Sequence, residues 1–208
     1  MHENSYSKIE WFKNSYLSSK DYLEILDVGS FDKYGHYNCR DIFNYPNWNY
    51  MGLDFKKGKN VDIIVEDVYN WDGILSDSFD VVVSCFFFEN VKFFWKTMGE
   101  IKRIIKPGGY ICIIVSSTDL NLEEATSYNN FQIEELIKLM KYFDFDIIHN
   151  SIDEYNEIKQ DICIIAINNF ENDDLKLKLD NIENKINAFL NFKQMIKSFE
   201  LDNFEKEV

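Results

Sequence analysis

The stretch LEILDVGSFDKYG, residues 23–35, reads as a short apolar strand that ends in an acid, a glycine and a polar loop. Residues 36–43, which follow it, could begin a helix. A strand–loop–helix unit directs backbone N–H groups toward one point, and this suits an anionic or polar ligand. Many α/β proteins have a glycine after the first strand, so the meaning of this stretch depends on the rest of the chain.

Apolar runs rich in β-branched residues recur after this stretch and predict buried parallel strands. With the first strand, they cover residues 24–28, 48–54, 61–65, 79–84, 110–115, 145–149 and 161–167. Helices are predicted at residues 5–18, 91–105 and 131–142, and residues 151–160 read as a loop or short helix. This order predicts a doubly wound, Rossmann-like α/β fold. We expect seven mostly parallel strands, the last antiparallel, with helices on both faces.

Three segments are expected from this pattern: a cap helix in residues 1–20, a sheet domain in residues 21–170 and a helical extension in residues 171–208. Apolar residues recur every three or four positions between residues 172 and 205, within a highly charged sequence. This spacing predicts an amphipathic helix. It would either pack on its own domain or form the contact of a homodimer.

Composition excludes several classes of function. The 208 residues carry a formal net charge of −14 without a basic cluster, which argues against a nucleic-acid partner. The four cysteines form no C-x-x-C pair, and the three histidines are too scattered to predict a metal site. Because we find no signal peptide and no apolar run long enough to span a bilayer, we expect a cytoplasmic protein that does not insert into membranes.

Polar residues follow four of the predicted strands at the point where each strand ends. They are the Asp27-x-Gly29 turn, Asp54, the Asp67-Val68 pair and Ser84. Ligands bind at the carboxyl ends of the strands in such folds, and an acid after the second strand can accept hydrogen bonds from a ribose diol. A nucleoside with a polar tail would use all four. A nicotinamide dinucleotide fits less well, because its G-x-G-x-x-G fingerprint is absent.

The chain resembles the class I S-adenosylmethionine-dependent methyltransferases over residues 22–116. The likeness rests on residues 26–30 (LDVGS), 50–54 (YMGLD), 79–84 (FDVVVS) and 104–109 (IIKPGG). It implies that S-adenosylmethionine is the cofactor and S-adenosylhomocysteine the product. Residues 1–8, 29–35 and 88–95 are similar to small bacterial methyltransferases of cell-surface polysaccharide biosynthesis. That narrower likeness implies a small-molecule acceptor such as a nucleotide sugar or glycan intermediate.

The resemblance also implies a role for each residue at the strand ends. Asp27, Gly29 and Ser30 would line the methionine part of the cofactor. Asp54 would bind the ribose hydroxyls, with Phe55 beside the adenine. Asp67 would accept from the adenine amino group, and the Val68 N–H would meet a ring nitrogen. The backbone of Ser84 and Cys85 would face the methionine amine.

The candidate catalytic residues are Glu89, Asn90 and His2. A hydroxyl acceptor needs a general base. Where the narrower family often has Glu-His, this chain has Glu89-Asn90, and an asparagine cannot act as a base at neutral pH. The base would then be Glu89, His2, His36 or another acid such as Asp119. The Asn90 substitution and the C-terminal helix leave an alternative, a weakly active or non-catalytic S-adenosylmethionine-binding subunit that acts with a partner protein.

Overall fold

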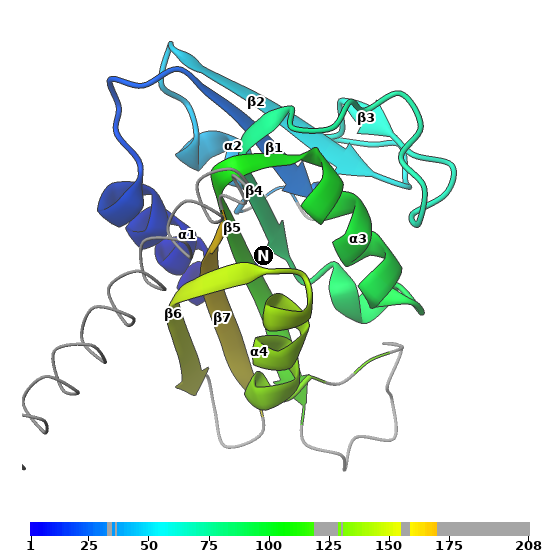
Figure 1. Ribbon diagram of the computed structural model, residues 1–208. Coiled ribbons are helices and arrows are strands. Elements are labelled where there is room, and N and C mark those ends of the chain that lie inside the picture. Colours follow the sequence, from blue (N-terminus) through cyan, green and yellow to red (C-terminus); the bar gives the residue numbers. More distant parts are fainter. Residues whose placement is uncertain (33–34, 36, 119–128, 130, 155–158, 170–208) are drawn as a thin grey trace, which may run out of the picture. The chain divides into compact units, whose positions relative to one another are not determined.

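The computed structural model describes residues 1–32, 35, 37–118, 129, 131–154 and 159–169 (Figure 1). All the elements described below lie in one compact unit, Met1–Asn169. The amphipathic helix predicted in residues 172–205 falls outside the described residues, and so do His36 and Asp119. None of the described helices is both long enough and apolar enough to cross a membrane.

The described strands form one seven-stranded sheet, as predicted. Its order is β3-β2-β1-β4-β5-β7-β6. Each pair from β3 to β5 is parallel, whereas β7 runs antiparallel to both β5 and β6. The strands are β1 (Leu23–Val28), β2 (Trp48–Asp54), β3 (Ile63–Ile64), β4 (Phe79–Cys85), β5 (Ile105–Thr118), β6 (Phe145–Glu154) and β7 (Lys159–Asn168).

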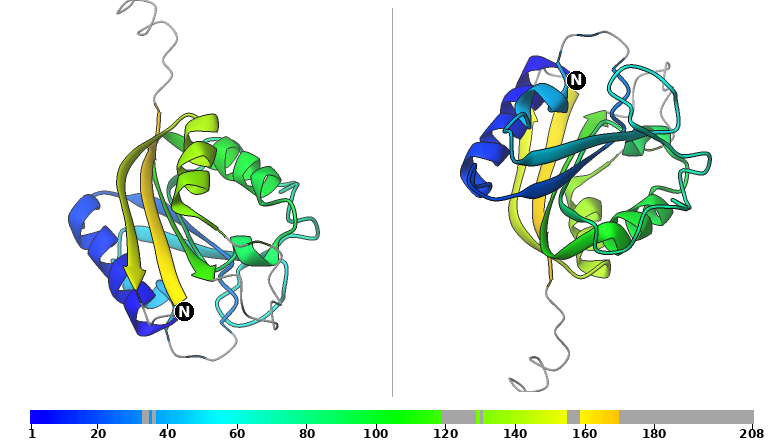
Figure 2. Two further views of the ribbon diagram at one scale, coloured as in Figure 1. Left: turned by 90° about the horizontal axis from the view of Figure 1, so that it is seen from below. Right: turned by 90° about the horizontal axis from the view of Figure 1, so that it is seen from above.

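Helices cover both faces of this sheet (Figure 2). On one face, α1 (Glu3–Tyr16) and the short α2 (Cys39–Ile42) bury Ile9, Phe12 and Ile42 against the sheet. On the other face lie α3 (Phe94–Ile104) and α4 (Ile133–Tyr142). Side chains alternate between the two faces along each strand, so β-branched strands buried on both sides supply both cores.

Residues 151–160 differ from the prediction of a loop or short helix. The strand β6 continues to Glu154 and β7 begins at Lys159, so the two strands pair well beyond their apolar centres. Polar residues there find partners on α1: Lys8 Nζ lies 2.8 Å from an Asp153 carboxylate oxygen and 3.2 Å from Ser151 Oγ. The apolar runs alone therefore underestimate the length of these strands.

Other boundaries move by a few residues. The third strand contains two residues instead of the predicted five, and α3 begins at Phe94 rather than at residue 91. A single 3-10 turn, η1 (Phe88–Asn90), occupies the interval before α3. It lies two residues beyond the end of β4, at the carboxyl edge of the sheet.

Candidate functional site

Two cavities lie at the carboxyl edge of the parallel strands. The first has a volume of about 330 Å³ and is lined by residues of the loops that follow β1, β2 and β4. The second, of about 350 Å³, is lined mainly by residues 66–69 and 90–92. The two cavities share Phe55 and Asn90, so they adjoin. An elongated ligand could therefore extend from one cavity into the other.

The turn after β1 forms one wall of the first cavity. Gly29 has a φ of +89°, and a Cβ at this position would lie 2.6 Å from Phe87 Cβ. The Gly29 and Ser30 N–H groups both donate to the Leu53 carbonyl, at 2.8 and 3.1 Å. Only glycine meets both the backbone and the packing requirement here. The Ser30 hydroxyl is buried and has no hydrogen-bond partner among the described residues, so it can serve a ligand.

Asp27 also lines the first cavity and is almost fully buried. The Tyr50 hydroxyl donates to Asp27 Oδ2 at 2.5 Å, and the Arg40 guanidinium lies 4.6 Å from the centre of the Tyr50 ring. Burial raises the pKa of Asp27 to about 6, against the lowering effect of the tyrosine hydrogen bond. The pairing with Tyr50, which the sequence alone does not reveal, fixes the orientation of this carboxyl group.

Asp54 stands at the end of β2 with its carboxylate in the first cavity. Its Oδ2 accepts from the Phe31 N–H at 3.2 Å and its Oδ1 from the Lys56 N–H at 2.9 Å. A carboxylate has about four acceptor sites, so both oxygens retain capacity for two hydroxyl donors. Phe55, the next residue, places its ring 6.1 Å from that of Phe87. The carboxylate therefore lies beside an aromatic wall.

Asp67 and Val68 lie in the second cavity. Asp67 is exposed, and its Oδ1 accepts from the Tyr69 N–H at 2.8 Å. The Val68 carbonyl accepts from Thr97 Oγ1 at 3.0 Å and from Trp71 Nε1 at 3.2 Å. The backbone of this loop is thus fixed at Val68 by two side chains that do not line the cavity.

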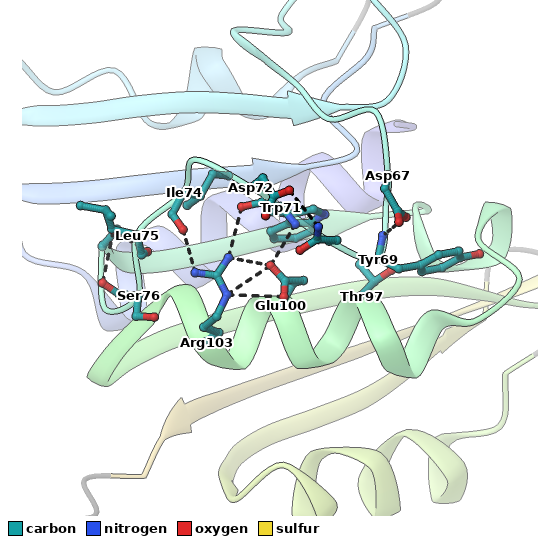
Figure 3. A network of polar contacts seen from close by, with 12 residues as sticks. Asp67, Tyr69, Trp71, Asp72, Ile74, Leu75, Ser76, Thr97, Glu100 and Arg103 are labelled. Atoms are coloured by element: carbon teal, nitrogen blue, oxygen red, sulfur yellow. Dashed lines mark hydrogen bonds and ion pairs between the residues drawn. The ribbon is translucent and has the colours of Figure 1, made fainter.

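A charged pair on α3 holds the same loop (Figure 3). Glu100 accepts from the Trp71 N–H at 3.1 Å. Arg103 donates to the Ile74 carbonyl at 2.7 Å and the Trp71 carbonyl at 3.3 Å, and its Nη2 lies 2.6 Å from Glu100 Oε2. In the sequence these residues belong only to a predicted helix, so their contact with the loop could not be foreseen.

The two residues predicted to face the methionine amine differ in position. Cys85 lines the first cavity, whereas Ser84 is fully buried and lines neither of the two. The Ser84 hydroxyl donates to the Val28 carbonyl at 2.9 Å. The side chain of Ser84 therefore ties β4 to β1.

Glu89 and Asn90 sit in η1, but only Asn90 lines the two cavities. Glu89 is 7% exposed and its Oε1 accepts from the Ser116 N–H at 2.6 Å. Burial raises the pKa of Glu89 to about 7. Asn90 donates through Nδ2 to the Phe86 carbonyl at 2.7 Å. Phe86 has a φ of +56°, which is uncommon for an aromatic residue, and this hydrogen bond helps to hold it there.

His2 reaches the same edge from the start of α1. Its Nε2 lies 3.1 Å from Asp161 Oδ2, and the Ser5 hydroxyl donates to the same oxygen at 3.0 Å. The His2 ring is 5.2 Å from that of Phe86, which lines the first cavity. The fold thus brings His2 close to the cavity wall, with Asp161 as a partner that sequence reasoning missed.

Comparison with known proteins agrees with the fold described above. Residues 38–113 match the family model of a methyltransferase domain. The chain has the fold of a class I methyltransferase. No curated protein is significantly similar in sequence.

Solved structures give the same fold. A putative methyltransferase of Bacillus halodurans aligns with a TM-score of 0.62 at 10% identity, over 80% of this chain and 100% of its own. The 1,6-didemethyltoxoflavin N1-methyltransferase of Burkholderia thailandensis, solved with S-adenosylhomocysteine bound, has a TM-score of 0.63 at 15% identity, over 80% of this chain and 79% of its own. At identities of 10% and 15%, these likenesses show the fold, so the cofactor has to be judged from the residues at the site.

The residues that line the two cavities fit the predicted cofactor, S-adenosylmethionine. Asp54 keeps acceptor capacity for ribose hydroxyls, and the Ser30 hydroxyl lacks a partner among the described residues. The first cavity opens against Gly29, where a side chain would be excluded. The second cavity adds an exposed carboxylate, Asp67, beside a fixed backbone. The sites predicted for ribose and adenine therefore lie in adjoining spaces.

Proposed function

We propose that this protein transfers a methyl group from S-adenosylmethionine to a small-molecule acceptor, the oxygen or nitrogen of a sugar or sugar-linked group in surface glycan biosynthesis. One observation carries the proposal. Two adjoining cavities at the carboxyl edge of the sheet place Asp54 and Asp67 in spaces joined by Phe55 and Asn90. The acceptor class rests on the sequence resemblance of residues 1–8, 29–35 and 88–95.

When bound, S-adenosylmethionine supplies a sulfonium methyl group that is already a good electrophile. The protein then contributes mainly orientation and exclusion of water. Asp54 would hold the ribose, and the Gly29 turn would receive the methionine portion against Phe87. Cys85 and Phe86 line the same cavity from the end of β4, where we place the entrance for the acceptor.

A hydroxyl acceptor must lose a proton during transfer. Glu89 is the first candidate to take it: it precedes Asn90, which lines both cavities, and a carboxyl group with a pKa of about 7 is partly ionised at neutral pH. His2 is the second candidate, since Asp161 orients its ring beside Phe86. Asn90 would position Phe86 rather than accept a proton. An amine acceptor in its neutral form would not need a strong base.

The first test is calorimetric titration with S-adenosylhomocysteine. Replacing Asp54 by alanine should weaken binding by about 1–3 kcal/mol, because hydrogen bonds to a charged group are lost. The control is Asp146→Ala, an exposed acid of β6 that changes net charge equally. Absence of binding by the unaltered protein would refute the proposal. Equal affinity in the Asp54 variant would show that the ribose lies elsewhere.

The second test identifies the acceptor class. The protein is incubated with methyl-labelled S-adenosylmethionine and a panel of nucleotide sugars and glycan intermediates. Label transferred to any member supports the enzyme. The alternative is a weakly active subunit, favoured by the structural role of the Asn90 amide at Phe86. Transfer that occurs only after addition of a co-purified partner would support that alternative.

A further inference from the structure

A third cavity, of about 450 Å³, lies between α1 and β6. It shares no lining residue with the two cavities at the carboxyl edge of the sheet. The side chains around it combine an aromatic ring with several hydrogen-bonding groups, and they are Asn4, Ser7, Lys8, Trp11, His149 and Asp153. Small-molecule sites have this size and this mixture of surfaces.

The aromatic element of the third cavity is Trp11. This residue is 40% exposed. The His149 ring lies 4.7 Å from the Trp11 ring at an angle of 57°, and the Tyr16 ring meets Trp11 edge-on at 5.8 Å. Two aromatic neighbours therefore hold the indole in place. Lys8 Nζ also lies 5.8 Å from the centre of the Trp11 ring, so a ligand ring would stack on the part of the indole that stays exposed.

The charges of the third cavity are compensated within it. Lys8 Nζ lies 2.8 Å from Asp153 Oδ2 and donates to Ser151 Oγ at 3.2 Å. Burial, helped by the Lys8 charge, lowers the pKa of His149, which favours a neutral imidazole. A phosphate or carboxylate ligand would have to compete with Asp153 for Lys8. A neutral ligand meets no such competition.

His149 also carries an unused polar atom. Its Nε2 is buried and has no hydrogen-bond partner among the described residues. A neutral imidazole can accept or donate at this nitrogen according to its tautomer. A ligand hydroxyl can do either, and Asn4 and Ser7 provide further hydrogen-bonding groups on the facing helix. Ring stacking together with many neutral hydrogen bonds is the recognition chemistry of a sugar.

Two side chains, Asp161 and His2, lie between the wall of the third cavity and the wall of the first. Asp153 stands opposite Asp161 in the β6–β7 register. Asp161 contacts His2, and His2 packs on Phe86 in the wall of the first cavity. Along α1, the rise from His2 to Trp11 is about 14 Å at 1.5 Å per residue. A chain of a few sugar rings covers such a length, whereas a single ring does not.

We propose that the third cavity is a distal sugar-binding subsite, in which Trp11 stacks on one ring of an extended glycan acceptor while another ring occupies the first cavity. This inference rests on the proposed function and assigns its acceptor to oligosaccharides or glycan-linked intermediates. It also gives the strand β6, which carries His149 and Asp153, a role in acceptor specificity.

The test uses saturation-transfer NMR with a panel of unmodified disaccharides and the methyl glycosides of common pyranoses. The unaltered chain is compared with Trp11→Leu, which keeps an apolar side chain without a stacking surface, and with Trp11→Phe, which retains a ring. Trp95→Leu is the matched control, since Trp95 is 47% exposed and lines none of the three cavities. Affinity for S-adenosylhomocysteine is measured for all variants by calorimetry.

We expect saturation transfer from the unaltered chain to pyranose protons, retained in Trp95→Leu and in Trp11→Phe. The signal should fall about fivefold or more in Trp11→Leu, as expected for loss of aromatic stacking. Binding of S-adenosylhomocysteine should be equal in all variants, and this separates loss of the subsite from loss of the methyl-donor site. No transfer to any sugar, or equal transfer in Trp11→Leu and the unaltered chain, would overturn the inference. Absence of S-adenosylhomocysteine binding would instead refute the proposed function.

Discussion

Glu89→Gln should change the pH dependence of stability in a way that can be calculated from the structure. The Glu89 carboxyl group is 7% exposed, and burial raises its pKa to about 7 in the folded state. The unfolded chain should ionise this group with the ordinary glutamate pKa of about 4.3. The folded state therefore binds the proton more tightly. The stability contribution is full below the unfolded pKa and is lost as the pH rises to the folded value.

A tenfold change in an acid constant corresponds to about 1.4 kcal/mol. Ionisation of Glu89 should thus lower the free energy of unfolding by up to about 3 kcal/mol between pH values of about 4.3 and about 7. The glutamine side chain of the variant cannot ionise, but its amide oxygen can still accept from the Ser116 N–H, which donates to Glu89 at 2.6 Å. An unpaired buried amide donor would add a cost that does not vary with pH.

The assay is urea unfolding followed by tryptophan fluorescence at pH 5, 6, 7 and 8. The stability of the Glu89→Gln variant relative to the unaltered chain should increase steadily with pH by about 2–3 kcal/mol in total and level off above pH 7. The control is Glu135→Gln, an exposed acid on α4, for which no comparable change is expected. A difference between variant and unaltered chain that stays constant from pH 5 to pH 8 would refute the assignment of a buried, proton-binding Glu89.

Gly29→Ala should lower the free energy of unfolding by about 2–4 kcal/mol, because alanine disfavours the left-handed backbone and its Cβ would overlap Phe87. It should also weaken S-adenosylhomocysteine binding. Urea unfolding would check the first effect and calorimetry the second. Arg103→Met should cost about 1–3 kcal/mol of stability and reduce cofactor affinity, because the Trp71 and Ile74 carbonyls lose their donor; unchanged affinity would show that this anchor does not control the second cavity. Removal of residues 172–208 should reduce the apparent mass in size-exclusion chromatography by more than the deleted segment if they form a dimer, and a mass-proportional change would contradict the dimer.

The parallel half of the sheet could be predicted from the sequence because its strands are buried on both faces. Such strands read as continuous apolar runs, and their carboxyl ends meet at one edge. Asp27, Gly29 and Asp54 could therefore be placed together from the strand boundaries alone. The prediction needed no knowledge of side-chain contacts.

The remaining features depend on contacts between residues far apart in the chain. The raised pKa of Glu89 follows from its burial, and its carboxylate accepts a hydrogen bond from the Ser116 N–H of β5. The ends of β6 and β7 are polar, and they pair because Ser5 and Lys8 of α1 satisfy Asp161 and Asp153. Neither relation leaves a periodic pattern that could be recognised in the sequence.

The position of β7 has a consequence for how the chain is made. It is the last described strand in sequence, yet it lies between β5 and β6 in the sheet. During synthesis from the N-terminus, β5 and β6 must therefore wait with unpaired edges until residues 159–168 have emerged. Unpaired apolar edges are aggregation-prone. A nascent chain interrupted before this strand would be the form most dependent on chaperones. Insertion of β7 would then pair the free edges of β5 and β6 in one step.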